Sequence, residues 1–214
     1  MDLKQGRELI LIGLTGNIAC GKSAVLGMLR QRGAGVIDAD GVVHQLMQPG
    51  GTIYTPVVAV FGNVILGEPD AQGNVPIDRR KLGAIVFGDA EQLRRLESIS
   101  HPLVRIEIIR QIQETTAKVV VLDAIKLIEN GLHEAADAVW VVKCEPEVQL
   151  ERLMRRNNFS REEALLRIEA QSPQADKIAV ADVAIDNSGT LEATEMQVEK
   201  AWQGIEEGRH RETQ

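Results

Sequence analysis

The N-terminal part of the chain holds an apolar run that leads directly into a glycine-rich turn. Residues 9–14 read Leu-Ile-Leu-Ile-Gly-Leu, and the turn that follows has the spacing Gly16-x-x-x-x-Gly21-Lys22-Ser23. A fully apolar run predicts a buried strand, and glycine permits turns and close backbone approaches that a Cβ atom would obstruct. The stretch therefore predicts a strand, a tight loop and a helix in succession, which is the first part of an α/β unit.

The loop has the spacing of a phosphate-binding site. Backbone N–H groups in such a loop surround an anion, and the positive end of the following helix faces it. Lys22 would place a positive charge beside the β- and γ-phosphates of a nucleoside triphosphate, and Ser23 would offer its hydroxyl to Mg²⁺. We therefore predict a nucleotide-binding loop, with an ordinary glycine-rich turn as the alternative.

Composition indicates a globular protein from a reducing compartment. The chain has 214 residues, of which 44% are hydrophobic and 26% charged, and its net charge is −7. Such a charge argues against general affinity for nucleic acid or membranes, so anionic ligands must be held by locally grouped positive side chains. Cys20 and Cys144 are the two cysteines, and a disulfide framework is not expected. No apolar run approaches roughly 18 residues and the first residues are polar, so we expect a soluble, cytoplasmic protein, a monomer or a weak homo-oligomer.

Five short apolar runs, rich in Val and Ile, predict buried strands. Because the runs are apolar at every position, they favour a parallel sheet that is covered on both faces. The predicted fold class is α/β, with a five-stranded parallel sheet. The runs are Leu9–Leu14, Gly35–Ile37, Val119–Leu122, Val139–Val142 and Val183–Ile185.

Two longer segments interrupt the strand pattern. Residues 41–115 hold a turn-rich portion and then helical periodicity, with Pro102 in the position of a second helix's first turn. After the fourth strand, residues 146–157 and 160–171 predict two helices, the second of which opens on a capping box. We therefore predict a nucleotide-binding core (1–40, 116–150 and 179–214), a mostly helical insertion (41–115) and a helical lid (151–178).

Two acidic residues follow the second predicted strand, in Val36-Ile37-Asp38-Ala39-Asp40. The carboxyl ends of strands in an open α/β sheet form its ligand-binding edge. If the chain is extended there, both side chains share one face, and a carboxylate can accept a proton from an attacking hydroxyl. We expect Asp40 to be that base; helix capping by one aspartate and solvation of the other is the alternative.

Other charged residues fit a phosphoryl-transfer site in more than one way. Asp123 ends an apolar run, as does the acid that holds Mg²⁺ directly or through water in phosphate-loop proteins. Arg152 and Arg156 lie four residues apart and would reach phosphate from one helical face of a lid, although charge runs also form solvated helix faces. Arg79 would meet an anionic acceptor or cap a helix, and a lone histidine such as His101 more often packs or caps than catalyses.

These features together resemble the dephospho-coenzyme A kinases, from about residue 9 to about residue 189. The match depends on an ordered set of motifs and not on the phosphate loop alone. The motifs are Gly13-Leu14-Thr15-Gly16, Asp38-Ala39-Asp40, Pro49-Gly50, Phe61-Gly62, Asp78-Arg79-x-x-Leu82, His101-Pro102, Asp123 with Glu129, Gln149-x-x-Arg152-Leu153-x-x-Arg156, Arg167 with Gln171, and Ala181-Asp182-Val183-Ala184-Ile185-Asp186-Asn187-x-Gly189.

The resemblance implies a nucleotide-kinase-like core, a helical acceptor domain and a lid. It implies transfer of the γ-phosphate of ATP to the ribose 3′-hydroxyl of dephospho-coenzyme A, with Mg²⁺ bridging the β- and γ-oxygens. The implied catalytic residues are Asp40, Lys22 and Arg152. The predicted acceptor contacts are Asp38, Arg79, His101, Asp123 and Lys126. The implied nucleotide contacts are Gly16, Asn17, Ala19, Cys20, Gly21, Lys22, Ser23 and Ala24, with Arg156 and, near adenine, Asn187.

Two segments depart from the family pattern. Asn17 and Ala19 replace glycines of the family's loop; Asn tolerates a positive φ and Ala adds only a methyl group, so we expect the loop to persist. The family's Asp-x-Pro-Leu-Leu-x-Glu reads Asp123-Ala124-Ile125-Lys126-Leu127-Ile128-Glu129 here. Lys126 would either contact an acceptor phosphate or mark a shifted acceptor preference.

The sequence is also compatible with two other functions. One is a kinase for another nucleotide or small metabolite on the same core, which the Asp-Ala-Asp and His-Pro motifs disfavour. Another is a regulatory nucleotide-binding protein; guanine-specific switches carry Asn-Lys-x-Asp, and that tetrapeptide is absent from the sequence.

Overall fold

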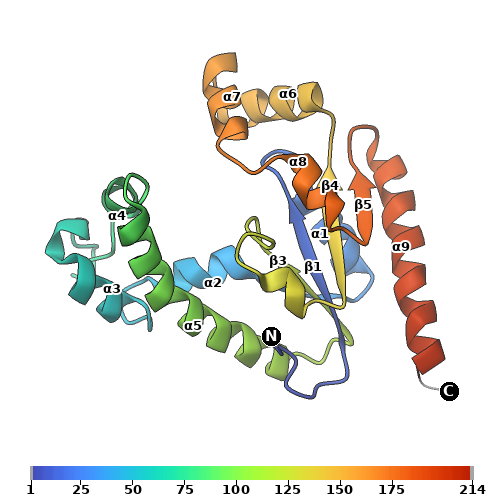
Figure 1. Ribbon diagram of the computed structural model, residues 1–214, viewed down its shortest axis with the longest axis horizontal. Coiled ribbons are helices and arrows are strands. Elements are labelled where there is room, and N and C mark those ends of the chain that lie inside the picture. The colour runs from blue at the N-terminus through green and yellow to red at the C-terminus, as the bar shows by residue number, and fades with distance from the viewer. Residues whose placement is uncertain (1, 213–214) are drawn as a thin grey trace. The chain divides into compact units, whose positions relative to one another are not determined.

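Five strands form one sheet, in the order β2-β3-β1-β4-β5. The computed structural model describes the backbone of residues 2–212 and the side chains of residues 2–205 and 207 (Figure 1). Strand β1 is parallel to β3 and to β4, and β4 is parallel to β5, as continuous apolar runs favour. The predicted fold class and all five predicted strands are confirmed. The strands are β1 (Ile10–Gly16), β2 (Gly35–Asp38), β3 (Val119–Asp123), β4 (Ala138–Lys143) and β5 (Val183–Asp186).

By its internal contacts the chain divides into two units. Unit 1 comprises Met1–Ile37 and Thr115–Gln214 and carries the sheet, whereas unit 2 comprises Asp38–Glu114 and is helical. The helices of unit 1 are α1 (Lys22–Gln31), α6 (Pro146–Asn157), α7 (Arg161–Glu169), α8 (Gln174–Ala179) and α9 (Leu191–Glu212), with the 3-10 turn η2 (Leu132–Ala135).

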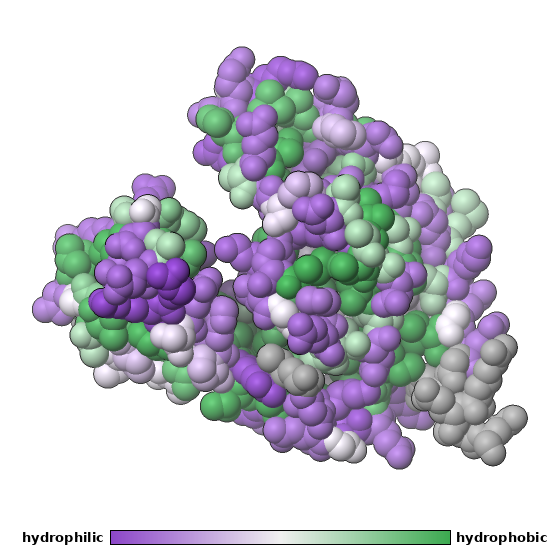
Figure 2. All heavy atoms as spheres, in the orientation of Figure 1, coloured by the Kyte–Doolittle hydropathy of each residue, from purple (hydrophilic) through white to green (hydrophobic). Residues whose placement is uncertain are grey.

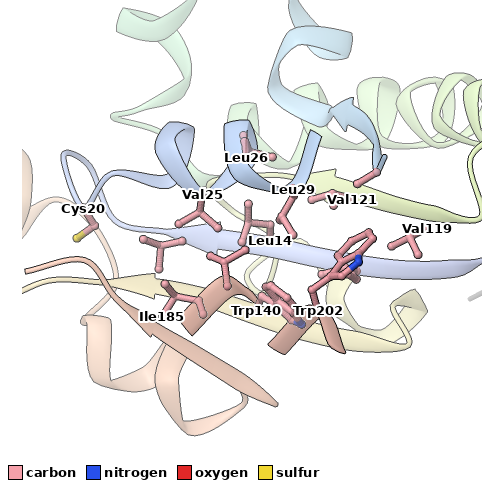
Figure 3. Close-up of a cluster of buried hydrophobic side chains, with 14 of the residues drawn as sticks. Leu14, Cys20, Val25, Leu26, Leu29, Val119, Val121, Trp140, Ile185 and Trp202 are labelled. Atoms are coloured by element: carbon pink, nitrogen blue, oxygen red, sulfur yellow. The ribbon is translucent and has the colours of Figure 1, made fainter. Parts of the chain in front are cut away.

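The main core of unit 1 lies between one face of the sheet and helices α1 and α9 (Figure 3). Leu14 of β1 and Trp140 of β4 are fully buried, as are Val25 and Leu29 of α1. Helix α9 contributes Trp202, which is 7% exposed. Burial of aliphatic side chains contributes about 1.5–3 kcal/mol each, so this cluster fixes the strand that leads into the glycine-rich loop.

A smaller cluster joins that loop to the helices after β4. Leu150 and Leu153 of α6 pack with Ala164 of α7, and Ile18 and Ala19 pack against them. Helix α7 begins at the predicted capping box, in which the Ser160 side chain accepts from the Glu163 N–H and the Glu163 side chain accepts from the Ser160 N–H.

Unit 2 is built around one long helix. It contains α2 (Ala39–Leu46), α3 (Tyr54–Phe61), the 3-10 turn η1 (Asn63–Ile65), α4 (Arg79–Val86) and α5 (Ala90–Glu114). Helices α2, α3 and α4 all contact α5, which buries Ser100, Val104, Ile108 and Ile112.

The prediction that Pro102 begins a second helix is wrong, because α5 continues through it. A proline inside a helix removes one backbone hydrogen bond. Here the buried positions 100, 104, 108 and 112 lie four residues apart along a single stripe. Burial of that stripe outweighs the local cost of the proline.

No helix in the described part of the chain is both long and apolar enough to cross a membrane. The face in Figure 2 shows hydrophilic residues interspersed with hydrophobic ones, including over α6 and α7.

Candidate nucleotide-binding site

The loop between β1 and α1 needs glycine at both ends. A Cβ atom on Gly16 would lie 2.6 Å from the Val142 carbonyl oxygen of the neighbouring strand. Gly21 has a φ of +90°, and a Cβ atom there would lie 1.9 Å from Nδ2 of Asn187. The neighbouring backbone excludes a side chain at Gly16, and the left-handed conformation together with Asn187 excludes one at Gly21.

The departures from the family loop have a different basis from the one predicted. Ala19, not Asn17, adopts the positive φ, at +62°. Asn17 is only 6% exposed, and its Nδ2 donates to the Ser172 carbonyl oxygen at 3.1 Å. The loop accepts Asn17 because the side-chain amide of Asn17 forms a hydrogen bond with the segment after α7. The conformational strain of the loop falls on Ala19, which has the positive φ.

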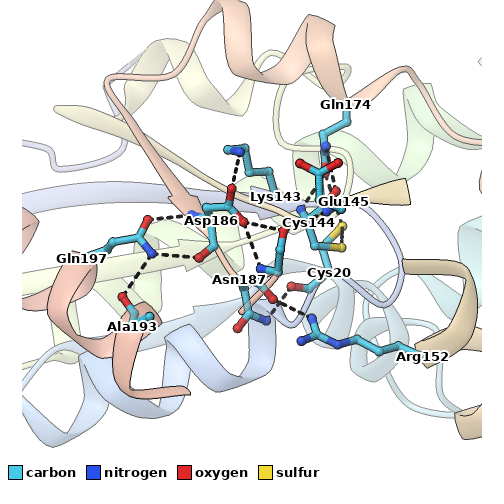
Figure 4. A network of polar contacts seen from close by, with 11 residues as sticks. Cys20, Lys143, Cys144, Glu145, Arg152, Gln174, Asp186, Asn187, Ala193 and Gln197 are labelled. Atoms are coloured by element: carbon cyan, nitrogen blue, oxygen red, sulfur yellow. Dashed lines mark hydrogen bonds and ion pairs between the residues drawn. The ribbon is translucent and has the colours of Figure 1, made fainter. Parts of the chain in front are cut away.

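Side chains from distant segments hold the loop's peptide groups. Gln149 of α6 donates to the Ile18 carbonyl oxygen at 2.9 Å, and the Ile18 N–H donates to the Gln171 side chain at 2.7 Å. Asn187, which follows β5, donates to the Cys20 carbonyl oxygen at 2.8 Å (Figure 4). Gln149 and Gln171 had no predicted role, although both belong to the motifs that carry the family resemblance.

A cavity of about 820 Å³ opens over this loop within unit 1. Four of the lining residues are cationic and none is acidic, in a chain of net charge −7. The loop, the start of α1 and one face of α6 supply nearly all of the lining. The lining residues are Gly16, Asn17, Ile18, Ala19, Gly21, Lys22, Ser23, Ile125, Arg152, Arg155 and Arg156.

This arrangement suits a polyphosphate. No side chain caps α1 within the described residues, so the first N–H groups of that helix are directed along its axis toward the loop. Arg152 donates through Nη1 to the Asn187 carbonyl oxygen at 2.8 Å, and this contact orients the guanidinium beside the loop. Arg155 and Arg156 are exposed.

Lys22 and Asp123 meet at the edge of the sheet. Lys22 Nζ forms an ion pair with Asp123 Oδ1, and the two side chains are 16% and 10% exposed. Strand pairing explains the meeting, because Asp123 is opposite Leu14, shortly before the loop, in the β1–β3 register. The predicted acid and the predicted loop lysine therefore form one ion pair, and Ser23, the next residue after Lys22, is exposed.

A buried lysine that the sequence did not reveal holds the segment after β3. Lys177 of α8 is 2% exposed; its Nζ donates to the Ile125 carbonyl oxygen at 2.7 Å and lies 3.3 Å from Glu129. The side chain of Lys126, the predicted acceptor contact, is exposed on the same segment. Lysine is rarely buried, so no sequence signal pointed to Lys177.

The aspartates after β2 do not lie on extended chain. Asp38 is the N-cap of α2 and accepts from the Gly41 N–H at 2.9 Å, while Asp40 is exposed in the first helical turn. The expectation of two side chains on one strand face is wrong, because capping by Asp38 starts the helix at Ala39. The alternative in which one aspartate caps a helix is correct for Asp38.

The remaining predicted acceptor residues also belong to unit 2. Arg79 is the exposed first residue of α4, and the cap of that helix is Asp78, which accepts from the N–H groups of Arg80 and Lys81. Those N–H groups lower the pKa of Asp78. His101 is exposed within α5. Asp38, Asp40, Arg79 and His101 thus share one unit, while the loop residues, Asp123, Lys126 and the arginines share the other.

Known proteins give a consistent comparison. A family model described as dephospho-CoA kinase matches residues 10–193. A dephospho-CoA kinase from Carboxydothermus hydrogenoformans is 48% identical over 193 residues, which cover 89% of this chain and 91% of that protein. Among solved structures, TT1252 from Thermus thermophilus is 31% identical with a TM-score of 0.77, covering 93% of this chain and 97% of the other. A dephospho-CoA kinase from Campylobacter jejuni is 26% identical with a TM-score of 0.58, covering 93% and 98%. A loop of this form on a parallel sheet, matched along most of the sequence, means that the chain belongs to the dephospho-CoA kinase family.

Proposed function

We propose that this chain transfers the γ-phosphate of ATP to the ribose 3′-hydroxyl of dephospho-CoA, giving CoA and ADP, the last step of CoA synthesis. The observation that carries the proposal is a cationic cavity over a phosphate loop in a member of this family. The family relation supplies the acceptor, and the cavity supplies the chemistry for the donor.

The triphosphate occupies the cavity of unit 1. Its oxygens accept hydrogen bonds from the loop and from the first turn of α1, and Lys22 neutralises the β- and γ-phosphates. Arg152, which is half-buried and held by the Asn187 carbonyl, stabilises the charge that develops during transfer. Arg156 contacts the phosphates from the same helical face.

The residues around Lys22 fit a magnesium ion. Mg²⁺ prefers oxygen ligands, and it usually keeps several waters and bridges substrate phosphates. Ser23 and Asp123 offer such oxygens, and the described residues include no group of three or more His, Cys, Asp or Glu that could hold a metal on their own. When bound, Mg²⁺ supplies positive charge to the β- and γ-phosphate oxygens.

Asp40 acts as the base of the reaction. Its carboxylate accepts the proton of the 3′-hydroxyl while that oxygen bonds to the γ-phosphorus and the bond to the ADP oxygen breaks. Asp40 lies two positions after Asp38, the last residue of β2. The Asp38 carboxylate is already engaged as the N-cap of α2. These observations favour Asp40 over Asp38 as the base.

Exposed cationic and polar side chains bind the acceptor in this proposal. Arg79, His101 and Lys126 are exposed and offer positive or hydrogen-bonding groups to the phosphates of dephospho-CoA. Residues 151–178, which include Arg152 and Arg156, form the lid that excludes water during transfer.

A labelled-phosphate assay tests the proposal. The purified chain is incubated with Mg²⁺ and ATP that carries a labelled γ-phosphate, together with dephospho-CoA, its 3′-deoxy analogue, or a panel of nucleosides and small alcohols. We expect label to enter dephospho-CoA alone, and mass spectrometry to locate the new phosphate on the 3′-oxygen.

Transfer to another member of the panel, with dephospho-CoA left unchanged, would refute the acceptor and support a different small-molecule kinase. Label that enters the 3′-deoxy analogue would refute the 3′-hydroxyl as the nucleophile.

A further inference from the structure

The two cysteines of the chain meet directly beneath the phosphate loop. Cys20 belongs to the loop and Cys144 follows β4, 124 residues later, yet their Sγ atoms are 3.1 Å apart. Both thiols are free; Cys20 is 0% exposed and Cys144 is 2% exposed. Figure 4 shows the two sulfur atoms facing each other.

Neighbouring amides hold both cysteines in this position. The Gln174 side chain accepts from the Cys144 N–H at 3.1 Å and donates to the Cys144 carbonyl oxygen at 3.2 Å. The same Gln174 oxygen lies 3.4 Å from Sγ of Cys20. Asn187 holds the Cys20 carbonyl from the other side. The sulfur contact is thus fixed by four polar contacts and is not an accident of two mobile side chains.

The environment distinguishes the two thiols. The hydrogen bond that the sulfurs share lowers the pKa of Cys144 and raises the pKa of Cys20, and burial raises the latter further. The positive charge of Arg152 acts on both thiols in the lowering direction. Cys144 is therefore the thiol that ionises first, and a thiolate is the reactive form of cysteine.

We propose that Cys20 and Cys144 are a peroxide-sensitive dithiol whose oxidation to a disulfide ties the phosphate loop to the end of β4 and weakens nucleotide binding. Hydrogen peroxide is close to water in size, and Ala19 and Gly21, on either side of Cys20, line the open cavity. Because both sulfurs are buried beside this cavity, a small oxidant suits them better than a large disulfide reagent.

The chemistry balances with peroxide as the oxidant. The Cys144 thiolate attacks one peroxide oxygen, so an S–O bond forms, the O–O bond breaks, and hydroxide leaves and becomes water. Sγ of Cys20 then attacks Sγ of Cys144, so the S–S bond forms, the S–O bond breaks and a second water leaves. Two thiols and one peroxide give one disulfide and two waters.

Oxidation would disturb the loop at its most constrained point. A disulfide bond is about 2.05 Å long, so sulfurs that now lie 3.1 Å apart must approach by about 1 Å. Cys20 stands between Ala19 and Gly21, whose φ angles are +62° and +90°. A misplacement of about 1 Å in groups that position a substrate can cost about a hundredfold in rate, and we expect the same displacement of the loop to weaken nucleotide binding by about tenfold.

Thiol counting combined with nucleotide binding tests the inference. The protein is treated with hydrogen peroxide, quenched with catalase, unfolded and alkylated, and its intact mass is measured. We expect two alkyl groups before oxidation and none after it, with dithiothreitol restoring both. In parallel, titration with a fluorescent ATP analogue should show weaker binding after oxidation and full recovery after reduction.

Cys144→Ser is the matched variant, because it keeps the backbone contacts with Gln174 and removes the partner sulfur. We expect it to bind the analogue as the reduced wild type does and to keep that affinity after peroxide. The inference is overturned if the wild type keeps two alkylatable thiols, if the disulfide forms without a change in affinity, or if Cys144→Ser loses affinity to the same extent.

Thiol counting on the wild type needs no variant to fold, and neither readout needs the acceptor. A reduced protein that binds ATP but leaves dephospho-CoA unchanged would therefore count against the proposed function and not against the dithiol.

Discussion

At the scale of single residues, the position of Lys22 is fixed by an acidic partner. Its ion pair with Asp123 leaves the side chains only 16% and 10% exposed. Removing one member of an ion pair at this depth takes away an opposite charge that compensates the other in a poorly solvated place. Lys22 therefore serves both the fold of the loop and, in the proposed reaction, the phosphates.

We expect Lys22→Ala to lower kcat/KM for phosphoryl transfer by about a hundredfold or more, since a preorganised charge on the transferring group is lost. Steady-state kinetics measures kcat/KM, and calorimetric titration measures the affinity for ATP. Lys200→Ala, which removes an exposed lysine of α9, is the control and should leave both values unchanged. Full activity in Lys22→Ala would remove this lysine from the mechanism.

Gly21→Ala should destabilise the protein by more than about 1–2 kcal/mol, because alanine pays that cost in the left-handed region and its Cβ would meet Asn187. Gly27→Ala is a matched control within α1, where a new Cβ meets nothing within 4 Å. That variant should stabilise the helix by about 0.5–1 kcal/mol. Urea unfolding of both variants measures the difference, and equal stabilities would contradict the steric argument.

Local sequence predicted residues whose role depends on local spacing. Gly16, Gly21, Lys22 and Ser23 lie within eight consecutive positions, so the loop geometry follows from the motif. Lys177 bonds to a carbonyl 52 positions away, and no pattern along the chain marks that distance. The contact between the cysteines is of the same kind.

At the scale of elements, burial decided which predictions were correct. All five strands are apolar at nearly every position, and that pattern has few alternatives. The break predicted at Pro102 was wrong, and the start of α2 was predicted only as the alternative, because local signals compete with packing there: Pro102 normally marks a helix start, and Asp38 fits either a strand end or a cap.

An ion pair between β4 and β5 should make the stability of the fold sensitive to acid. Lys143 and Asp186 are partners in that register and form an ion pair at 2.5 Å. Lys143 and Ser188 lower the pKa of Asp186 from 3.8 to about 2. A carboxylate with a depressed pKa stabilises the fold above its ordinary pKa, and that contribution is lost as the pH falls from about 4 toward 2.

Asp186→Asn should therefore be less stable than the wild type at pH 6, and the difference should shrink as the pH falls toward 2. Chemical denaturation at a series of pH values measures it. Asp176→Asn, which removes an exposed carboxylate of the same unit, is the control. A difference that stays constant across the series would rule out the ion pair as its source.

At the scale of the whole molecule, the proposed reaction divides its groups between two units. The phosphate loop, Asp123 and Arg152 belong to unit 1, and Asp40, Arg79 and His101 belong to unit 2. The sequence pointed to a helical insertion after β2 from its length and turns. Which of its side chains contact an acceptor depends on packing between distant segments, and those roles stay predictions.

Asp40→Asn should lower kcat by about a hundredfold or more, because general-base catalysis contributes roughly 10²–10⁴. The dissociation constant for ATP should change by less than about twofold, since the triphosphate site belongs to the other unit. Rapid-quench kinetics and nucleotide titration separate the two effects. Weaker ATP binding with unchanged turnover would move Asp40 from catalysis to nucleotide contact.

The bracing of the loop by Gln149, Gln171 and Asn187 has a thermodynamic consequence. A loop whose peptide groups are already fixed loses little conformational freedom when an anion enters it, so more of the contact energy appears as affinity. Heat measured on binding inorganic triphosphate should then be accompanied by only a small unfavourable entropy. Truncation of any one of these three side chains to alanine should enlarge the unfavourable entropy of binding more than it changes the enthalpy of binding.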